Sequence, residues 1–194
     1  MSRLDDALKR FGTIFSKVQK KDLEEPTAMI LATATASGIP SARVVLLKSY
    51  GRDGFVFYTN QKSRKGRDLA ENPHAALCFY WDGIDDQIRI EGSVVPVSSE
   101  EADAYWVTRP RNSQIGAWAS LQSEPLDKRR TFLKRIAQFA LRFGTKAIPR
   151  PAHWSGYRLT PRRIEFWKKK PFRLHERTLY EIHNEERTVH DLYP

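Results

Sequence analysis

The stretch that decides the fold is AMILATATASGIPSARVVLLKSYGRDGFVFYTN, residues 28–60. It consists of short runs rich in β-branched and aromatic residues, and the turn signals ASGIP and SYGRDG separate these runs. Residues of this kind suit the pleated, half-buried surface of a sheet. The pattern therefore predicts a meander of antiparallel strands.

Strand signals continue on both sides of a region with helical periodicity. They recur at residues 74–81, 87–97, 155–160, 163–167, 172–182 and 187–193. The strands do not alternate with helices as they would in parallel βαβ units. The sequence therefore predicts a mainly β fold, a closed antiparallel barrel with helices at its ends.

The N-terminal segment has the apolar spacing of an amphipathic helix that packs on the barrel. Its apolar residues recur every three or four positions, at Leu4, Leu8, Phe11, Phe15 and Val18. We expect one domain over residues 1–194, divided into an N-terminal helix at 1–20, a helical insertion at 98–145 and C-terminal strands at 154–194.

Three more helices are predicted from their caps. Ser63 is a plausible N-cap for a short helix that ends at Asn72 and Pro73. Ser98 and Glu101 have the spacing of a capping box and begin a helix that runs to about Arg109. The third helix covers residues 127–143, and the following glycine ends it.

The composition indicates the kind of partner. The chain has 33 lysines and arginines against 23 acidic residues, a formal charge of +10, so it favours anionic partners such as nucleic acid, a membrane surface or phosphorylated small molecules. The single cysteine, Cys78, lies in an apolar run and is interpreted as a core thiol of a protein in a reducing compartment. No signal peptide or membrane-spanning run is found, so we expect a soluble, cytoplasmic protein.

The basic stretch KKKPFRLHER, residues 168–177, is the first candidate for chemistry. If it is a strand, alternation sends Arg173, His175 and Arg177 to one face, where two guanidiniums and an imidazole suit an anion and a proton transfer. A solvated edge strand kept soluble by charge explains Lys168 to Lys170 equally well. The residues alone leave both interpretations open.

Two other segments carry groups that suit a phosphate. Ser63, Arg64 and Lys65 lie at a predicted helix N-terminus, where free N–H groups and the helix dipole favour an anion. Tyr105 and Arg109 are four residues apart on a predicted helix, and Ser113 follows shortly; as an alternative, Tyr105 belongs to the core.

The absence of several sequence motifs narrows the range of possible functions. The sequence contains no HExxH, CxxC, GxSxG or P-loop pattern, and its five histidines are dispersed, which argues against metal and covalent hydrolytic enzymes. Several phosphate-binding segments with aromatic residues between them fit a phosphorylated aromatic cofactor better than a long polyanion.

These segments, in this order, resemble the pyridoxine/pyridoxamine 5′-phosphate oxidase family. The matching strings are EPTAM, RVVLLK, GFVFYTNQKSRKG, RPRNSQIGAWASLQS, GYRLTPRRIEFW and RLHER. They cover residues 25–180 almost without a gap. The resemblance implies a split β-barrel homodimer of Greek-key type, with FMN at the subunit interface.

The resemblance also implies roles for single residues. FMN contacts would fall on Arg43, Lys48, Tyr58, Thr59, Arg64, Lys65, Gln87, Gln122, Ser123, Trp167 and Arg177. The substrate phosphate would be held by Lys48, Tyr105, Arg109 and Ser113, and the pyridine ring would be approached by the catalytic residues Arg173 and His175. No metal is implied.

The implied reaction is the oxidation of pyridoxine or pyridoxamine 5′-phosphate by dioxygen to pyridoxal 5′-phosphate and hydrogen peroxide. Two alternatives stay open at this point: a related FMN enzyme acting on another ring, such as a phenazine precursor, and a basic module that only binds flavin or nucleic acid. The family's C-terminal Trp-x-x-x-Arg-Leu-x-Pro pattern here reads Arg187, Asp191, Leu192 and Pro194, so we expect weaker anchoring of the last strand.

Overall fold

The computed structural model describes residues 3–21, 23–81, 83–182 and 187–194. Its helices are α1 (Arg3–Gln19), α2 (Arg64–Glu71), α3 (Ser99–Thr108), α4 (Arg111–Ala119), α5 (Arg129–Phe143) and the 3₁₀ turn η1 (Pro171–Arg173). Its strands are β1 (Ala28–Ala34), β2 (Pro40–Leu46), β3 (Ser49–Gly51), β4 (Gly54–Asn60), β5 (His74–Tyr80), β6 (Asp86–Pro96), β7 (Trp154–Lys168), β8 (Glu176–Ile182) and β9 (Arg187–Leu192). Within this described part, no helix is long and apolar enough to cross a membrane.

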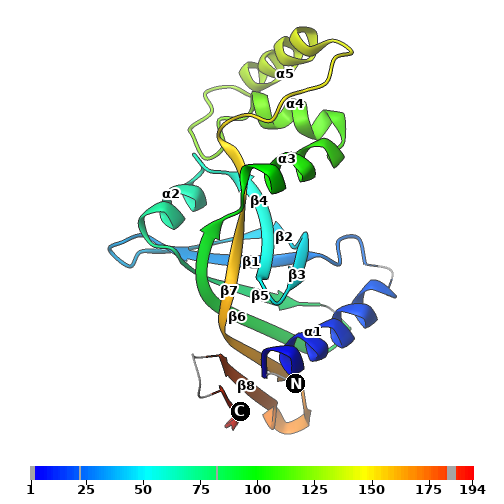
Figure 1. Ribbon diagram of the computed structural model, residues 1–194, viewed down its shortest axis with the longest axis vertical. Helices are drawn as coiled ribbons and strands as arrows, with labels where there is room; N and C mark the ends of the chain where they lie inside the picture. Colours follow the sequence, from blue (N-terminus) through cyan, green and yellow to red (C-terminus); the bar gives the residue numbers. More distant parts are fainter. Residues whose placement is uncertain (1–2, 22, 82, 183–186) are drawn as a thin grey trace.

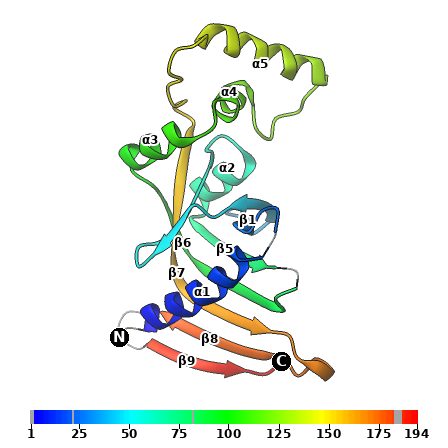
Figure 2. The ribbon, with the colours of Figure 1, turned by 90° about the vertical axis from the view of Figure 1, so that its right-hand side faces the viewer.

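The strands form one curled antiparallel sheet, in the order β2-β1-β5-β6-β7-β4-β3, with β8 on β7 and β9 on β8. Figures 1 and 2 show the long β7 running from helices α3 to α5 at one end to β8 at the other. The prediction of a mainly β barrel with helices at its end is confirmed. Among the described strands the hydrogen-bonded path is open, with edges at β2 and β3, so the barrel is split rather than closed.

Strand β7 joins two segments that the sequence divides at Pro161. It pairs with β6 over residues 157–168, with β4 at one end and with β8 at the other. The register of β6 shifts between Glu91 and Gly92, opposite Pro161, and this bulge accommodates a residue without an N–H group. A Cβ on Gly92 would lie 1.9 Å from the carbonyl oxygen of Thr160, so the close approach of the two strands requires glycine there.

The core lies between the concave face of the sheet and α1. The predicted stripe of α1 is buried, and the Phe11 ring is 0% exposed. Phe11 lies edge-on to Tyr50, Phe55 and Phe79, with ring centroids 4.7, 5.2 and 5.3 Å away. The N-terminal helix therefore completes the core, as predicted.

The predicted caps of two helices are present. The Ser63 hydroxyl accepts from the N–H of Gly66, and the Ser98 hydroxyl accepts from the N–H of Glu101. Helix α5 is followed by Gly144, which has a φ of 48°. A further helix, α4, was not predicted, because its sequence RNSQIGAWA lacks a clear apolar stripe. Its Gln114 side chain donates to the carbonyl of Trp106 and fixes α4 against α3.

The prediction that residues 172–175 already belong to a strand is wrong. Phe172 and Arg173 have positive φ values of 57° and 61°, which turn the chain after Pro171, and β8 begins only at Glu176. Arg173, His175 and Arg177 therefore do not alternate along one strand. The last strand β9 pairs with β8 over its whole length, and Asp191 accepts a hydrogen bond from the Thr178 hydroxyl.

Replacing Phe11 with alanine tests whether α1 belongs to the core. We expect Phe11→Ala to lower the free energy of unfolding by about 3–5 kcal/mol, because it removes a fully buried ring and leaves a cavity. The matched control is Leu141→Ala, whose side chain is 84% exposed and whose loss should change stability by less than about 0.5 kcal/mol. Denaturant unfolding at one fixed protein concentration measures both; equal effects would contradict the assignment.

Candidate functional site

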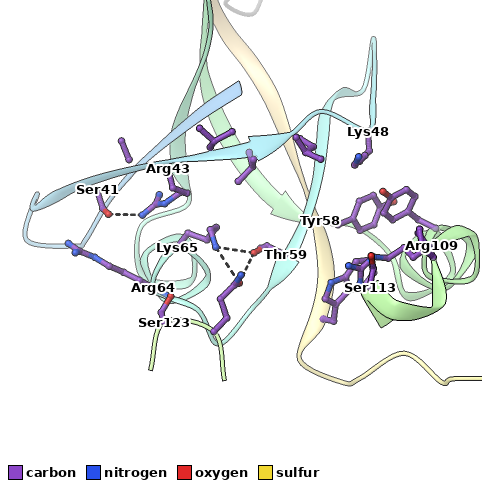
Figure 3. Close-up of a pocket in the computed structure, with 18 of the residues that line it drawn as sticks. Ser41, Arg43, Lys48, Tyr58, Thr59, Arg64, Lys65, Arg109, Ser113 and Ser123 are labelled. Atoms are coloured by element: carbon purple, nitrogen blue, oxygen red, sulfur yellow. Dashed lines mark hydrogen bonds between the residues drawn. The ribbon is translucent and has the colours of Figure 1, made fainter. Parts of the chain in front are cut away.

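A cavity of about 760 Å³ lies between β2, β4, α2, α3 and α4. We call it the main cavity. Most of the predicted site residues line it, namely Arg43, Lys48, Tyr58, Thr59, Arg64, Lys65, Tyr105, Arg109, Ser113, Gln122 and Ser123. Figure 3 shows Arg43, Lys65 and Ser123 on one side and Lys48, Arg109 and Ser113 on the other. The cavity thus has positive charge on two opposing sides.

The first side is built at the N-terminus of α2. The Lys65 ammonium donates to the Thr59 hydroxyl at 3.2 Å and to the Gln122 amide oxygen at 3.3 Å, and the N–H of Arg64 donates to the Ser123 hydroxyl. A Cβ on Gly66 would lie 2.1 Å from the carbonyl oxygen of Gln61, so glycine lets the helix start against this loop. A helix N-terminus with adjacent cations suits a phosphate.

Arg43 reaches the same side from β2. Its guanidinium donates to the hydroxyls of Thr33 and Ser41, each at 2.7 Å. The buried carboxylate of Asp68 on α2 lies 3.7 Å from Arg43 and accepts from Thr33 at 2.6 Å. Asp68 was not predicted from the sequence.

The positive charges of Arg43 and Lys65 repel each other in the free protein. Burial, and then the positive charge of Arg43, lower the pKa of Lys65 to about 8. The pKa of Arg43 is also lowered, mainly by burial, although Asp68 opposes the shift. A bound anion would relieve this repulsion, so the electrostatics favour an anionic ligand.

The second side combines aromatic rings with Arg109. Tyr58 stacks on Tyr105 at 4.0 Å and on Trp154 at 5.3 Å, measured between ring centroids. The Arg109 guanidinium lies 4.7 Å from the centroid of Trp154 and 5.1 Å from that of Trp106. Its Nη1 is buried and has no hydrogen-bond partner among the described residues. Such an unsatisfied donor at a cavity points to a ligand oxygen.

Burial shifts the pKa values of two residues on this side. Burial lowers the pKa of Arg109, and burial followed by the charge of Glu101 raises the pKa of Tyr58 to about 12. Tyr58 therefore keeps its proton at neutral pH and can donate a hydrogen bond.

Trp154 and Thr108 also line the cavity but were not predicted, since no residue pattern separates Trp154 from a core tryptophan.

The remaining predicted residues gather elsewhere, in what we call the second cluster: Gln87, Trp167, His175 and Arg177. Gln87 and Arg177 flank Trp167 on the neighbouring strands, and the His175 ring lies 4.6 Å from the Trp167 ring. The Nδ1 of His175 accepts from the N–H of Lys170 at 3.3 Å. Arg173 lies in the turn just before this cluster.

The two groups of residues are separated along β7. Trp154 lines the main cavity, whereas Trp167 lies thirteen residues further along the strand. At about 3.3 Å per residue this is about 40 Å of strand. One copy of the chain therefore does not bring both groups around one small molecule.

Comparisons with known proteins match most of the chain. The family model described as pyridoxamine 5′-phosphate oxidase matches residues 15–143, and the one described as pyridoxine 5′-phosphate oxidase C-terminal dimerisation region matches residues 154–194. A pyridoxine/pyridoxamine 5′-phosphate oxidase of Sphingopyxis alaskensis is 57% identical over 91% of this chain and 82% of its own. The protein of the same name from Alkalilimnicola ehrlichii is 53% identical over 99% and 98%.

Solved structures show the same fold. PhzG from Burkholderia lata 383, in complex with tetrahydrophenazine-1-carboxylic acid, has a TM-score of 0.87 and 35% identity over 96% of this chain and 90% of its own. A pyridoxamine 5′-phosphate oxidase-related, FMN binding protein from Nostoc punctiforme has a TM-score of 0.75 at 17% identity, over 96% of each chain. The second likeness concerns the fold alone.

The lowered pKa of Lys65 predicts anion binding that depends on pH. Only the ammonium form attracts an anion, so affinity should be highest below the pKa of about 8 and fall as the pH rises through it. We expect this in calorimetric titrations with sulfate, whose charge is constant over this range. Lys65→Arg should bind sulfate at all these pH values, because a guanidinium stays protonated, and Lys65→Met should bind weakly throughout. The same pH profile in Lys65→Arg would exclude Lys65 as the titrating group.

Proposed function

This chain belongs to the pyridoxamine 5′-phosphate oxidase family, and we propose that it oxidises pyridoxine 5′-phosphate, pyridoxamine 5′-phosphate or both to pyridoxal 5′-phosphate. FMN is the proposed cofactor, and dioxygen is the proposed electron acceptor, with hydrogen peroxide as the second product. The main support in the structure is a cavity with cationic side chains on two opposing sides. One site would take the phosphate of FMN, and the other would take that of the substrate.

The residues of the main cavity fit the phosphate of FMN. Arg64, Lys65 and Ser123 surround the N-terminus of α2, and Arg43 lies beside them. Burial, and then repulsion from Arg43, lower the pKa of Lys65, and a bound phosphate would relieve that repulsion. Bound FMN would supply the acceptor for the hydride that leaves C4′ of the substrate.

The opposite side fits the substrate phosphate. Lys48, Tyr105, Arg109 and Ser113 line it, and the unpaired Nη1 of Arg109 provides a donor that a phosphate oxygen would satisfy. Trp154 holds Tyr58, Tyr105 and Arg109 by stacking, so these groups are oriented before the substrate arrives. The protein's task at this side is to fix the pyridine ring by its phosphate.

Arg173 and His175 would act on the pyridine ring. Because the Nδ1 of His175 accepts from the N–H of Lys170, the neutral ring carries its proton on Nε2, which is left to donate to the substrate. The guanidinium of Arg173 would stabilise charge as the reaction proceeds. Both residues lie away from the main cavity of their own chain, so they would serve the cavity of a second copy.

A homodimer accounts for this division. The family's dimerisation region covers residues 154–194, which include Trp167, His175 and Arg177 of the second cluster. The convex face of the sheet also exposes large apolar side chains, with Ile30, Tyr80 and Val44 at 43%, 58% and 65% exposure. We propose that FMN lies at the interface, between the main cavity of one protomer and the second cluster of its partner.

The oxidase activity can be tested directly. The FMN-loaded protein should convert pyridoxine 5′-phosphate in air to equal amounts of pyridoxal 5′-phosphate and hydrogen peroxide. Unphosphorylated pyridoxine should be a far poorer substrate, because it gains nothing from Lys48, Tyr105, Arg109 and Ser113. Comparable rates with both alcohols would instead favour a ring substrate of the kind bound by the phenazine-related neighbour. Bound FMN without turnover of either would contradict the proposed activity.

Mixing two inactive variants tests whether the site is shared between protomers. Arg109→Ala impairs the main cavity, and the double variant Arg173→Ala, His175→Ala impairs the second cluster. After co-refolding, half of the dimers are mixed and each has one intact site, so activity should return to about a quarter of the wild-type value. If each site lies within a single chain, mixing restores nothing.

A further inference from the structure

Glu165 is a buried carboxylate with no part in the proposed reaction. It lies on the convex face of β7, and its side chain is only 6% exposed. Register pairs it with Arg89 of β6 and Leu179 of β8, which project to the same face. An ionised group this deeply buried is costly unless charged partners satisfy it.

Two arginines hold Glu165, one at each oxygen. The Nε of Arg177 donates to Oε1 at 2.8 Å, and the Nη2 of Arg89 lies 3.2 Å from Oε2. Arg89 also donates to Glu91 at 2.8 Å, and Glu91 lies 3.4 Å from Arg163. The result is a chain of alternating charges across β6 to β8, in which Glu165 cannot rotate without losing a partner.

Arg177 is oriented by these contacts. Its Nε is fixed by Glu165, and its Nη1 donates to the carbonyl of Tyr193 at 3.0 Å. Its Nη2 has no hydrogen-bond partner among the described residues, so one edge of the guanidinium is left for a ligand. The bond to Glu165 also raises the pKa of Arg177.

We propose that Glu165 is a positioning residue for the flavin site: it aims the guanidinium of Arg177 at the FMN bound in the partner's cavity. This inference rests on the proposed function, because it takes Arg177 as a flavin contact. The competing interpretation is that the chain of charges only fastens β6, β7 and β8 together. The two differ in whether Glu165 acts on flavin binding through Arg177 or on stability alone.

The test measures the dissociation constant of FMN from the quenching of its fluorescence on titration with the flavin-free protein. Glu165→Gln keeps the shape of the side chain and removes its charge, and we expect it to weaken FMN binding about tenfold. The matched control is Glu91→Gln, which breaks the same chain of charges without touching Arg177 and should change the constant by less than about twofold.

A double-mutant cycle distinguishes a role of Glu165 in orienting Arg177 from a role in holding the three strands together. In an Arg177→Gln background, Glu165→Gln should have no further effect on FMN binding, because the group that it positions is gone. An undiminished effect there, or equal effects of Glu165→Gln and Glu91→Gln, would overturn the inference. If Glu165→Gln does not fold, Glu165→Asp serves the same cycle, since it keeps the charge and shortens the reach.

The outcomes also separate this inference from the proposed function. Wild-type protein that does not bind FMN would reject the proposed function itself. Tight binding by both the wild type and Glu165→Gln would leave the function standing and reject only the role of Glu165.

Discussion

The unbroken run of β7 is the constraint on which the rest of the structure depends. One strand of fifteen residues bonds to β6 over residues 157–168, to β4 at its start and to β8 at its end. The bulge opposite Pro161 keeps the strand continuous where proline would otherwise end the pairing. Because β7 is long, Trp154 and Trp167 lie far apart, near its two ends. The division of the proposed site between two protomers follows from that separation.

A second constraint is the free-energy cost of burying several cations around one cavity. Arg43, Lys65 and Arg109 all have lowered pKa values, with burial as the largest cause in each. A fold selected only for stability would place such groups in water. Here hydroxyls and one buried carboxylate, Asp68, hold Arg43 in place without neutralising the whole cavity. The free protein therefore bears an electrostatic cost that an anionic ligand would remove.

Much of the fold was predictable because it depends on interactions between residues close in sequence. Strand runs, the caps at Ser63 and Ser98 and the stripe of α1 depend on neighbours in sequence, and all are present. Helix α4 and the turn at Arg173 were missed because tertiary contacts and a left-handed backbone decide them. Most of the cavity residues came from the family resemblance, since their strings are specific. Three further residues contact predicted site residues from other elements: Asp68 contacts Arg43, Trp154 contacts Tyr58, and Glu165 contacts Arg177. The spacing of residues along the chain does not reveal such contacts.

A ligand shared between protomers would link cofactor binding to assembly. Any molecule that binds only the dimer stabilises it, by an amount that grows with the logarithm of the ratio of its concentration to its dissociation constant. The exposed Ile30 and Val44 offer apolar area for association on the convex face, where Glu165 and Arg177 also lie. On this arrangement, the same sheet face supplies both the contact between protomers and the aimed guanidinium. On the proposed arrangement, the ion pair of Glu165 with Arg177 would serve both assembly and cofactor binding. That would give a physical reason to bury a charge there rather than an apolar side chain.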